Sequence, residues 1–283
     1  VKKIFFFSKL LLRNNNSLLQ VGDNDSGCFF DLDFSKDSLE KKKIHILLSE
    51  KESFSLFYII KKYVGDDFFE NFNKNSCVIK KNTLEFCSNK NRRSFFIPFD
   101  QKVNINKIKL YTFKDFGLYC YLHKKFSLYV ICKSNYEYYN SGHLHDDNLA
   151  IDLVIDKKNI ITDPGSLCYT SDLSVRNKYR SIYSHFAPRK LGYHLKENAF
   201  PFSFSNFLKG KVINVDKDIF FGKISYKNCN VFRKIQILST GLKINDYCSN
   251  GKLSNYEVFD NKEFISTSYR VLGKDRIIQT SLK

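Results

Sequence analysis

The feature that most constrains this chain is a series of short apolar segments, each with a period near two, that begins near residue 105. Such alternation over a few residues predicts half-buried strands. Turn signals separate the segments, as at Lys157–Asn159 and Ser249–Gly251, and no helical pattern intervenes. This arrangement predicts an antiparallel β-sandwich or barrel. The expected strands are Ile108–Phe113, Leu118–His123, Phe126–Cys132, Leu149–Ile155, Gly210–Val215, Ile219–Tyr226, Val231–Leu238, Leu242–Cys248, Phe264–Tyr269 and Arg276–Thr280.

The first ninety residues have a different pattern. Ser38–Lys51 is rich in Glu, Lys and Leu, and Phe54–Val64 has helical apolar spacing, whereas Asn71–Asn91 is polar like a connector. We therefore predict a helical part and connector over residues 1–95 and a β-sandwich over residues 96–283. Because the 283 residues include no Met, we expect the sequence to be a fragment of a longer protein.

The charge of the chain suits a polyanionic partner. Lys and Arg number 46 against 29 Asp and Glu, which gives a net charge of +17. The joint abundance of Lys, Asn, Ile, Phe and Tyr is also what an AT-rich coding sequence produces, so charge alone selects no function. The sequence has no basic helix, Arg-rich arm or zinc-finger spacing, and we do not expect a nucleic-acid partner. No apolar run reaches the roughly 20 residues of a membrane helix.

The eight cysteines are scattered, and none forms a CxxC pair. This excludes a zinc ribbon and a thioredoxin motif. Cys120 and Cys132 lie in expected strands, where we predict buried thiols rather than disulfide partners. Cysteine usage leaves both reducing and oxidising compartments open.

Residues that suit a chemical site cluster between Gly142 and His185. His143 and His145 are two positions apart, so in an extended segment both rings point to one side. Two buried imidazoles are costly unless a metal or a substrate uses them. Asp163 follows an apolar strand at a Pro-Gly turn, and His185 comes later. Each feature alone is typical of a turn or a solvated surface, but together two imidazoles and a carboxylate suit zinc.

The stretch Gly142–His185 resembles the signature of the heparinase II/III-like family, which reads roughly G-H-x-H-x-D-x-L, then D-P-G-x-x-x-Y, then R-N-x-x-R-S and a final His. Upstream, Val21–Gly27 resembles another stretch seen in members from polysaccharide gene clusters. The resemblance implies the end of a helical (α/α) toroid followed by an antiparallel β-sandwich (a supersandwich). It also implies cleavage of an anionic polysaccharide by β-elimination at a uronic acid, in the periplasm or cell envelope.

The resemblance also implies roles for individual residues. His145, Asp163 and His185 match the family's structural zinc ligands. His143 matches the histidine that faces the substrate, as a proton-transfer or carboxylate-neutralising group, and Tyr169 matches a second catalytic position.

Three further positions match polar residues of the same signature. Arg176 and Arg180 match basic, substrate-binding positions near the groove. Asp147 falls at the carboxylate position after the paired histidines, where we expect it to orient an imidazole N–H.

The sequence departs from the family pattern at two positions. Phe186 follows His185 where the family has Asn, and Ala150 stands where it often has Ser. β-Elimination also needs an acid and a base, and the family's remaining donors come from a toroid that we expect to precede Val1. We therefore predict the sandwich half of a lyase. The alternative is a non-catalytic glycan-binding or assembly protein of surface-polysaccharide production on the same fold.

Overall fold

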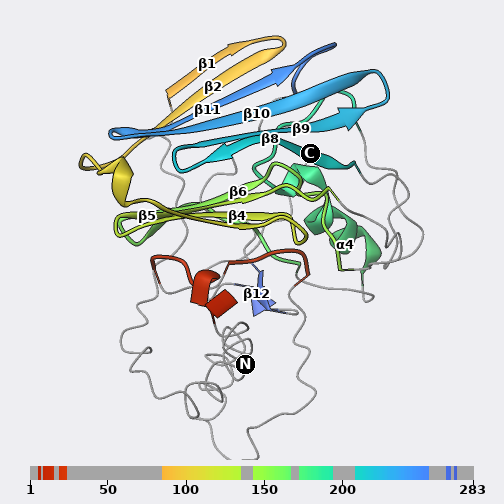
Figure 1. The fold of residues 1–283 in the computed structure, drawn as a ribbon. Coiled ribbons are helices and arrows are strands. Elements are labelled where there is room, and N and C mark those ends of the chain that lie inside the picture. Colours follow the sequence, from red (N-terminus) through yellow and green to blue (C-terminus); the bar gives the residue numbers. More distant parts are fainter. Residues whose placement is uncertain are drawn as a thin grey trace, which may run out of the picture.

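The fold is taken from a computed structural model of the chain (Figure 1). It describes residues 6–7, 9–15, 19–23, 85–134, 143–166, 172–193, 208–254, 266–268 and 271–272. The predicted helices between residues 38 and 64, the predicted strand at 276–280 and Tyr169 lie outside these residues.

Two antiparallel sheets lie face to face and form the sandwich, with the six-stranded sheet at the top of Figure 1. This sheet has the order β1-β2-β11-β10-β9-β8, with bounds Glu85–Asn89, Arg92–Pro98, Gly241–Cys248, Cys229–Leu238, Ile219–Tyr226 and Gly210–Asp216. The five-stranded sheet runs in chain order, with β3 Lys109–Phe113, β4 Leu118–His123, β5 Phe126–Ile131, β6 Ile151–Ile155 and β7 Lys158–Ile161. A short pair, β12 Ser266–Ser268 and β13 Val271–Leu272, forms a separate sheet. The predicted mainly β, antiparallel sandwich is confirmed.

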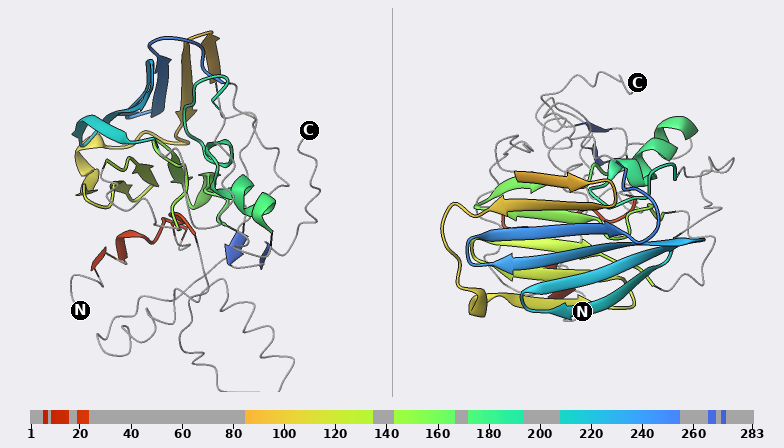
Figure 2. Two further views of the ribbon diagram at one scale, coloured as in Figure 1. Left: turned by 90° about the vertical axis from the view of Figure 1, so that its right-hand side faces the viewer. Right: turned by 90° about the horizontal axis from the view of Figure 1, so that it is seen from above.

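The period-two pattern explains how the six-stranded sheet faces the core. Along β10, Val231, Arg233, Ile235 and Ile237 are buried while the alternate residues Phe232, Lys234 and Gln236 are partly exposed, because successive side chains point to opposite faces. Figure 2 shows this sheet from above, with β10 and β11 near its middle. The inner faces of both sheets share one apolar core, formed in part by Phe95, Ile97, Phe126, Leu128, Leu153, Phe220, Ile235 and Ile244.

The middle of the five-stranded sheet is buried on both faces, so β5 and β6 show no alternation. Its outer face packs against the N-terminal segment, where Leu19 joins Leu118 and Tyr129 in a second apolar cluster. The Tyr129 hydroxyl donates a hydrogen bond to the Leu10 carbonyl at 3.0 Å. The described parts of this segment, residues 9–15 and 19–23, thus lie below the sheet in Figure 1.

The structure extends the sandwich beyond the predicted boundary at residues 95 and 96. The hairpin of β1 and β2 belongs to the six-stranded sheet, and that boundary falls inside β2. The cause is a strand pattern in Arg92–Pro98, whose second, fourth and sixth residues face inward. From Lys109 to Cys248 the predicted strands are confirmed to within about two residues at their ends.

The expectation that no helix interrupts the strands is wrong. The helix α4, Leu173–Arg180, lies between β7 and β8. The Asp172 side chain caps it by accepting a hydrogen bond from the Val175 N–H at 3.0 Å. Among the residues that the structure describes, no helix is long and apolar enough to cross a membrane.

The prediction of buried thiols at two cysteines is confirmed. Cys120 and Cys132 are both free and buried in the five-stranded half of the sandwich. Burial raises the pKa of each thiol to about 12, which keeps it protonated and unreactive.

Candidate functional site

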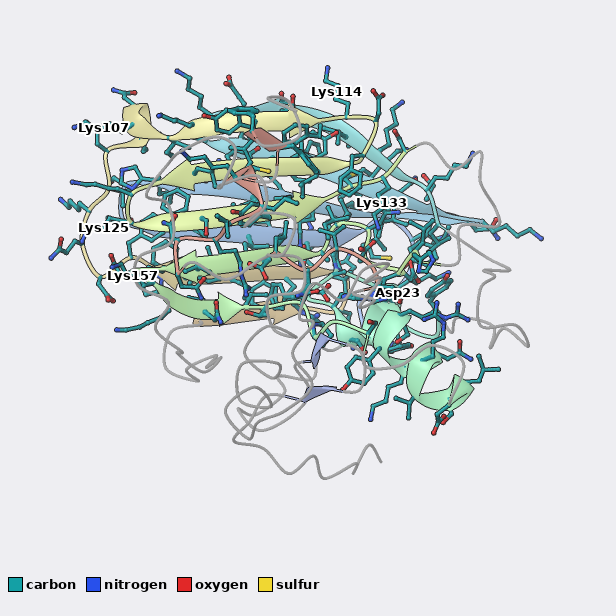
Figure 3. The ribbon with its side chains drawn as sticks, turned by 90° about the horizontal axis from the view of Figure 1, so that it is seen from below. Asp23, Lys107, Lys114, Lys125, Lys133 and Lys157 are labelled. Carbon is teal, nitrogen blue, oxygen red and sulfur yellow. The ribbon has the colours of Figure 1, made fainter. Side chains whose placement is uncertain are left out.

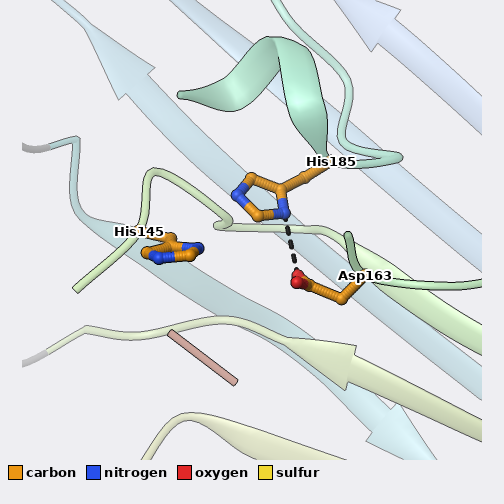
Figure 4. A group of neighbouring side chains, drawn as sticks. All are labelled: His145, Asp163 and His185. Atoms are coloured by element: carbon orange, nitrogen blue, oxygen red, sulfur yellow. Dashed lines mark ion pairs between the residues drawn. The ribbon is translucent and has the colours of Figure 1, made fainter. Parts of the chain in front are cut away.

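Three buried side chains from separate segments converge at one end of the sandwich (Figure 4). His145 lies in the loop before β6, Asp163 follows β7, and His185 follows the short 3-10 helix η3, Ile182–Ser184. One ligand atom from each residue lies within 4.8 Å of the others. The Asp-Pro-Gly turn fixes Asp163, whose carboxylate accepts a hydrogen bond from the Gly165 N–H at 2.9 Å. The structure thus brings together the three residues predicted as metal ligands.

The polar atoms of this trio fit a bound cation. His145 Nδ1 and His185 Nε2 are buried and have no hydrogen-bond partner among the described residues. His185 Nδ1 lies 2.9 Å from Asp163 Oδ2, but the contact is not aligned as a hydrogen bond. Buried polar atoms are rarely left unpaired because desolvation is costly. Two imidazoles and one carboxylate are a zinc donor set, so the residues present fit this metal.

The electrostatics of His145 and Asp163 also favour coordination. At His185, burial opposes the charge, but the neighbouring Asp163 raises the pKa above its usual value. Burial lowers the pKa of His145, which favours the neutral imidazole that binds metals. Burial opposes the charge on Asp163, yet the neighbouring His185 keeps the pKa of this carboxyl below its usual value. The site therefore combines an ionised carboxylate with a neutral ring.

His143 occupies a different environment from His145. Its side chain is 59% exposed, and His143 Nδ1 lies 3.2 Å from Asp23 Oδ2. The expectation that both histidines lie on an extended strand is wrong, because residues 143–150 form a loop that contains turns. The Asp146 N–H donates to the Arg180 carbonyl at 2.8 Å and the Ala150 N–H to the Asp147 carbonyl at 2.8 Å, which replaces strand pairing.

The two predicted substrate-binding arginines lie on α4 and face the protein interior. Arg176 is 1% exposed, and its guanidinium binds the carboxylate of Asp23. Arg180 is fully buried and donates from Nε to Asn177 Oδ1 at 2.9 Å. Burial, followed by the repulsion from Arg176, lowers the pKa of Arg180 to about 10. Contact of either arginine with substrate stays a prediction.

The expectation for Asp147 is wrong. Its carboxylate binds Lys133 Nζ at 2.8 and 2.9 Å, and no hydrogen bond joins it to an imidazole of the described histidines. Lys133 directly follows Cys132 beyond β5, so this ion pair ties the histidine loop to the five-stranded sheet. The side chain that contacts the imidazoles comes instead from far upstream.

Sequence reasoning missed Asp23, the acidic residue at the centre of the site. Asp23 Oδ1 lies 2.9 Å from His145 Nε2, and Asp23 Oδ2 lies 2.8 Å from a terminal nitrogen of Arg176. Burial opposes the charge of Asp23, but His145 and then Arg176 lower its pKa below the usual value. Figure 3 shows Asp23 beside α4. Asp23 lies in the stretch Val21–Gly27, which resembles a segment of family members, but no spacing rule links this stretch to the histidines.

Asp146 is a second residue that the sequence did not single out. It is fully buried, and neither carboxylate oxygen has a hydrogen-bond partner in the part of the chain that the structure describes. Burial, together with the neighbouring Asp147, raises its pKa to about 7. The site therefore contains buried carboxylate oxygens that have no hydrogen-bond donor among the described residues.

A model of a known protein family matches this region of the chain. Residues 108–186 match the model of the family described as heparinase II/III-like, C-terminal. The resemblance to the heparinase II/III-like family that the sequence predicts is thus found over these residues. The match spans β3 to His185 and includes all three members of the buried trio as well as His143.

Heparinases are among the solved structures that align with the chain. A gene product titled heparinase III aligns with 88% of this chain and 32% of its own, at 14% identity and a TM-score of 0.47. The heparan sulfate lyase HepC from Pedobacter heparinus aligns over 84% and 30%, at 12% identity and a TM-score of 0.43. No curated protein matches the chain. The chain spans about a third of the length of these solved structures.

Both residues that depart from the heparinase II/III-like pattern pack in the protein interior. Phe186 packs edge-on against Phe95 with ring centroids 5.4 Å apart, and its carbonyl accepts a hydrogen bond from Arg233. It therefore anchors the chain after His185 in the core. Ala150 is buried against Ile182, where a small side chain suits the close packing.

Proposed function

We propose that this chain forms the sandwich side of a polysaccharide lyase-like protein that acts on an anionic, uronic-acid-containing glycan by β-elimination. The observation that carries this proposal is the exposed His143, held by a buried carboxylate beside a candidate metal centre. The heparinase II/III-like match of the same residues supports it. The periplasmic or cell-envelope location predicted from the family belongs to this proposal.

The proposed reaction assigns a limited task to the described residues. The uronate carboxylate must be neutralised, the C5 proton removed, and the leaving O4 protonated. His143 is exposed enough to contact a glycan, and we assign it proton transfer or neutralisation of the substrate carboxylate. Tyr169 stays a predicted second catalytic residue. The enolate-like intermediate needs positive charge or neutral donors nearby, since its stabilisation is the costly part of the step.

A zinc ion is part of this proposal. His145, Asp163 and His185 would hold it, and when bound it would supply a fixed charge and rigidity rather than contact the substrate. Those three ligands connect the loop of His143 with the ends of β7 and η3. The loop that presents His143 would then be held in one conformation.

The net charge of +17 favours an anionic polysaccharide as the partner. Lys107, Lys114, Lys125 and Lys157 lie toward the periphery of the sandwich in Figure 3. Surface charge of one sign raises the encounter rate with a polyanion, and added salt screens this effect. Binding of a uronate glycan is therefore expected to weaken as ionic strength rises.

The direct test is a spectroscopic lyase assay. β-Elimination leaves a double bond conjugated with the uronate carboxylate, which absorbs in the ultraviolet. The 283-residue chain, and the protein expressed from its full coding sequence, would be incubated with heparan sulfate, alginate and other uronate glycans. We expect product from the full coding sequence, loss of it in His143→Ala, and little or none from the 283 residues alone.

A matched control is available in His123. This histidine ends β4, and its ring stacks on Phe126 with centroids 5.5 Å apart, away from the trio. His123→Ala should keep wild-type turnover per folded molecule. Glycan binding without product by the full coding sequence would overturn catalysis and support the alternative, a non-catalytic glycan-binding or assembly protein.

A further inference from the structure

The Asp23 carboxylate contacts both histidines of the loop. Oδ1 lies 2.9 Å from His145 Nε2 and 3.2 Å from one terminal nitrogen of Arg176. Oδ2 lies 3.2 Å from His143 Nδ1 and 2.8 Å from the other Arg176 nitrogen. Each oxygen therefore has one imidazole and one guanidinium neighbour. An amide could not replace this group, because one end of the amide is a donor.

The contact with His145 determines which nitrogen of that ring can bind a metal. An ionised carboxylate only accepts hydrogen bonds, so His145 Nε2 must carry the proton. In a neutral ring, Nδ1 then has the lone pair. His145 Nδ1 is the buried atom without a partner among the described residues, and its ring lies 5.3 Å from that of His185. Metal-binding histidines commonly donate their second N–H to a carboxylate in this way.

The backbone around Asp23 is fitted to the histidine loop. The Asp23 N–H donates a hydrogen bond to the His143 carbonyl at 3.0 Å. Gly22 has a φ of 71°, and a Cβ there would lie 2.5 Å from the same carbonyl oxygen. Only glycine permits this approach. The segment that carries Asp23 is thus docked against the backbone of His143 as well as its ring.

From these contacts we infer that Asp23 is a positioning residue that orients His145 toward the metal and His143 toward the substrate, with Arg176 as its anchor. The inference rests on the proposed function for the meaning of the His143 orientation. It gives Arg176 a role inside the protein, consistent with its burial. Asp23 thereby joins the metal centre and the substrate-facing ring through one carboxylate.

The test uses Asp23→Asn in the whole 283-residue chain, with Asp246→Asn as the matched control. Asp246 is also a buried carboxylate that binds both donor nitrogens of an arginine, Arg233, and it lies on β11 of the six-stranded sheet. Zinc affinity would be measured by competition with a chromophoric chelator. We expect Asp23→Asn to weaken zinc binding by about 10–100-fold, as removal of such outer partners does. The control should lose thermal stability yet bind zinc like the wild type.

A second measurement needs no variant. Long-range ¹H–¹⁵N spectra of the wild-type chain report the protonated ring nitrogen of His145, and the inference requires Nε2–H. An Nδ1–H ring, or unchanged zinc affinity in Asp23→Asn, would overturn the inference. Neither readout needs turnover. If both results are as expected but the wild-type protein shows no lyase activity, the proposed function is refuted. The role of Asp23 toward His145 then still holds.

Discussion

Two of the buried arginine–carboxylate pairs among the described residues lie in different regions, and their surroundings differ. In the six-stranded sheet, Arg233 binds both oxygens of Asp246, at 2.8 and 2.9 Å. The remaining terminal nitrogen of Arg233 donates to the Leu149 carbonyl at 2.9 Å. At the histidine site, Arg176 binds both oxygens of Asp23, but that carboxylate is shared with two imidazoles.

The difference between the two pairs distinguishes a structural network from a binding site. The pair in the sheet is satisfied by protein groups alone, as a buried ionic network must be to persist. Around the second pair, ring nitrogens of His145 and His185 and both oxygens of Asp146 lack partners within the described ranges. Such incomplete satisfaction is expected where a ligand completes the network. The Phe186 carbonyl is a further acceptor for Arg233.

The largest effect is expected when the Arg233–Asp246 ion pair in the six-stranded sheet is broken. Asp246→Ala leaves the guanidinium of Arg233 buried without its counter-ion, and this should cost about 3–5 kcal/mol of unfolding free energy. Urea unfolding followed by circular dichroism would measure the loss. A change under about 1 kcal/mol would show that the pair is not the structural element described above.

Removal of the metal should have the next largest effect, and only at the histidine site. Zinc at about 100 times its dissociation constant should stabilise the chain by about 2.7 kcal/mol. A chelator should abolish this zinc-dependent stabilisation, and the stability of His145→Ala should not depend on zinc. Thermal unfolding with and without zinc measures it, with His123→Ala as a control that keeps the shift. A full zinc-dependent shift in His145→Ala would refute the ligand assignment.

His143→Ala should separate stability from activity. Because this side chain is 59% exposed, the variant should unfold within about 0.5 kcal/mol of the wild type. Turnover or glycan affinity of the full coding sequence should fall at least about tenfold, since a proton-transfer or neutralising group is lost. Strong destabilisation with intact activity would reverse the roles of the two histidines.

The smallest effect is expected for an ion pair at the surface. Lys125 Nζ lies 3.3 Å from Asp156 Oδ1, and the side chains are 34% and 26% exposed. Lys125→Ala should change the unfolding free energy by less than about 1 kcal/mol, because solvent already screens the pair. A loss comparable to that of Asp246→Ala would mean that burial does not explain the contrast.

The fold was largely predictable because the strand signal is local. Alternation in segments such as Val231–Leu238 reports one buried face, and the structure confirms those strands. The hairpin of β1 and β2 was missed because Asn71–Asn91 was interpreted by its polar composition, although Arg92–Pro98 has the alternation. α4 was missed because its polar sequence has no wide apolar stripe, and its buried residues include Arg176 and Arg180.

The candidate site was predictable only where a motif covered it. His145, Asp163 and His185 were singled out by type and order, and the structure places them together. Asp23 lies in another part of the chain and reaches the histidines only through the docking of residues 19–23 on the sandwich. The preference of Asp147 for Lys133 likewise depends on where β5 ends. Such long-range partners follow from tertiary packing rather than from local spacing.

Diffraction from crystals grown with zinc, measured on both sides of the zinc absorption edge, tests the central claim most directly. We predict one strong anomalous peak bounded by His145, Asp163 and His185. The peak should lie about 2.0–2.2 Å from His145 Nδ1 and from an Asp163 oxygen. His145 Nε2 should remain in contact with Asp23. An anomalous peak elsewhere, no peak at the trio, or coordination through His145 Nε2 would contradict it.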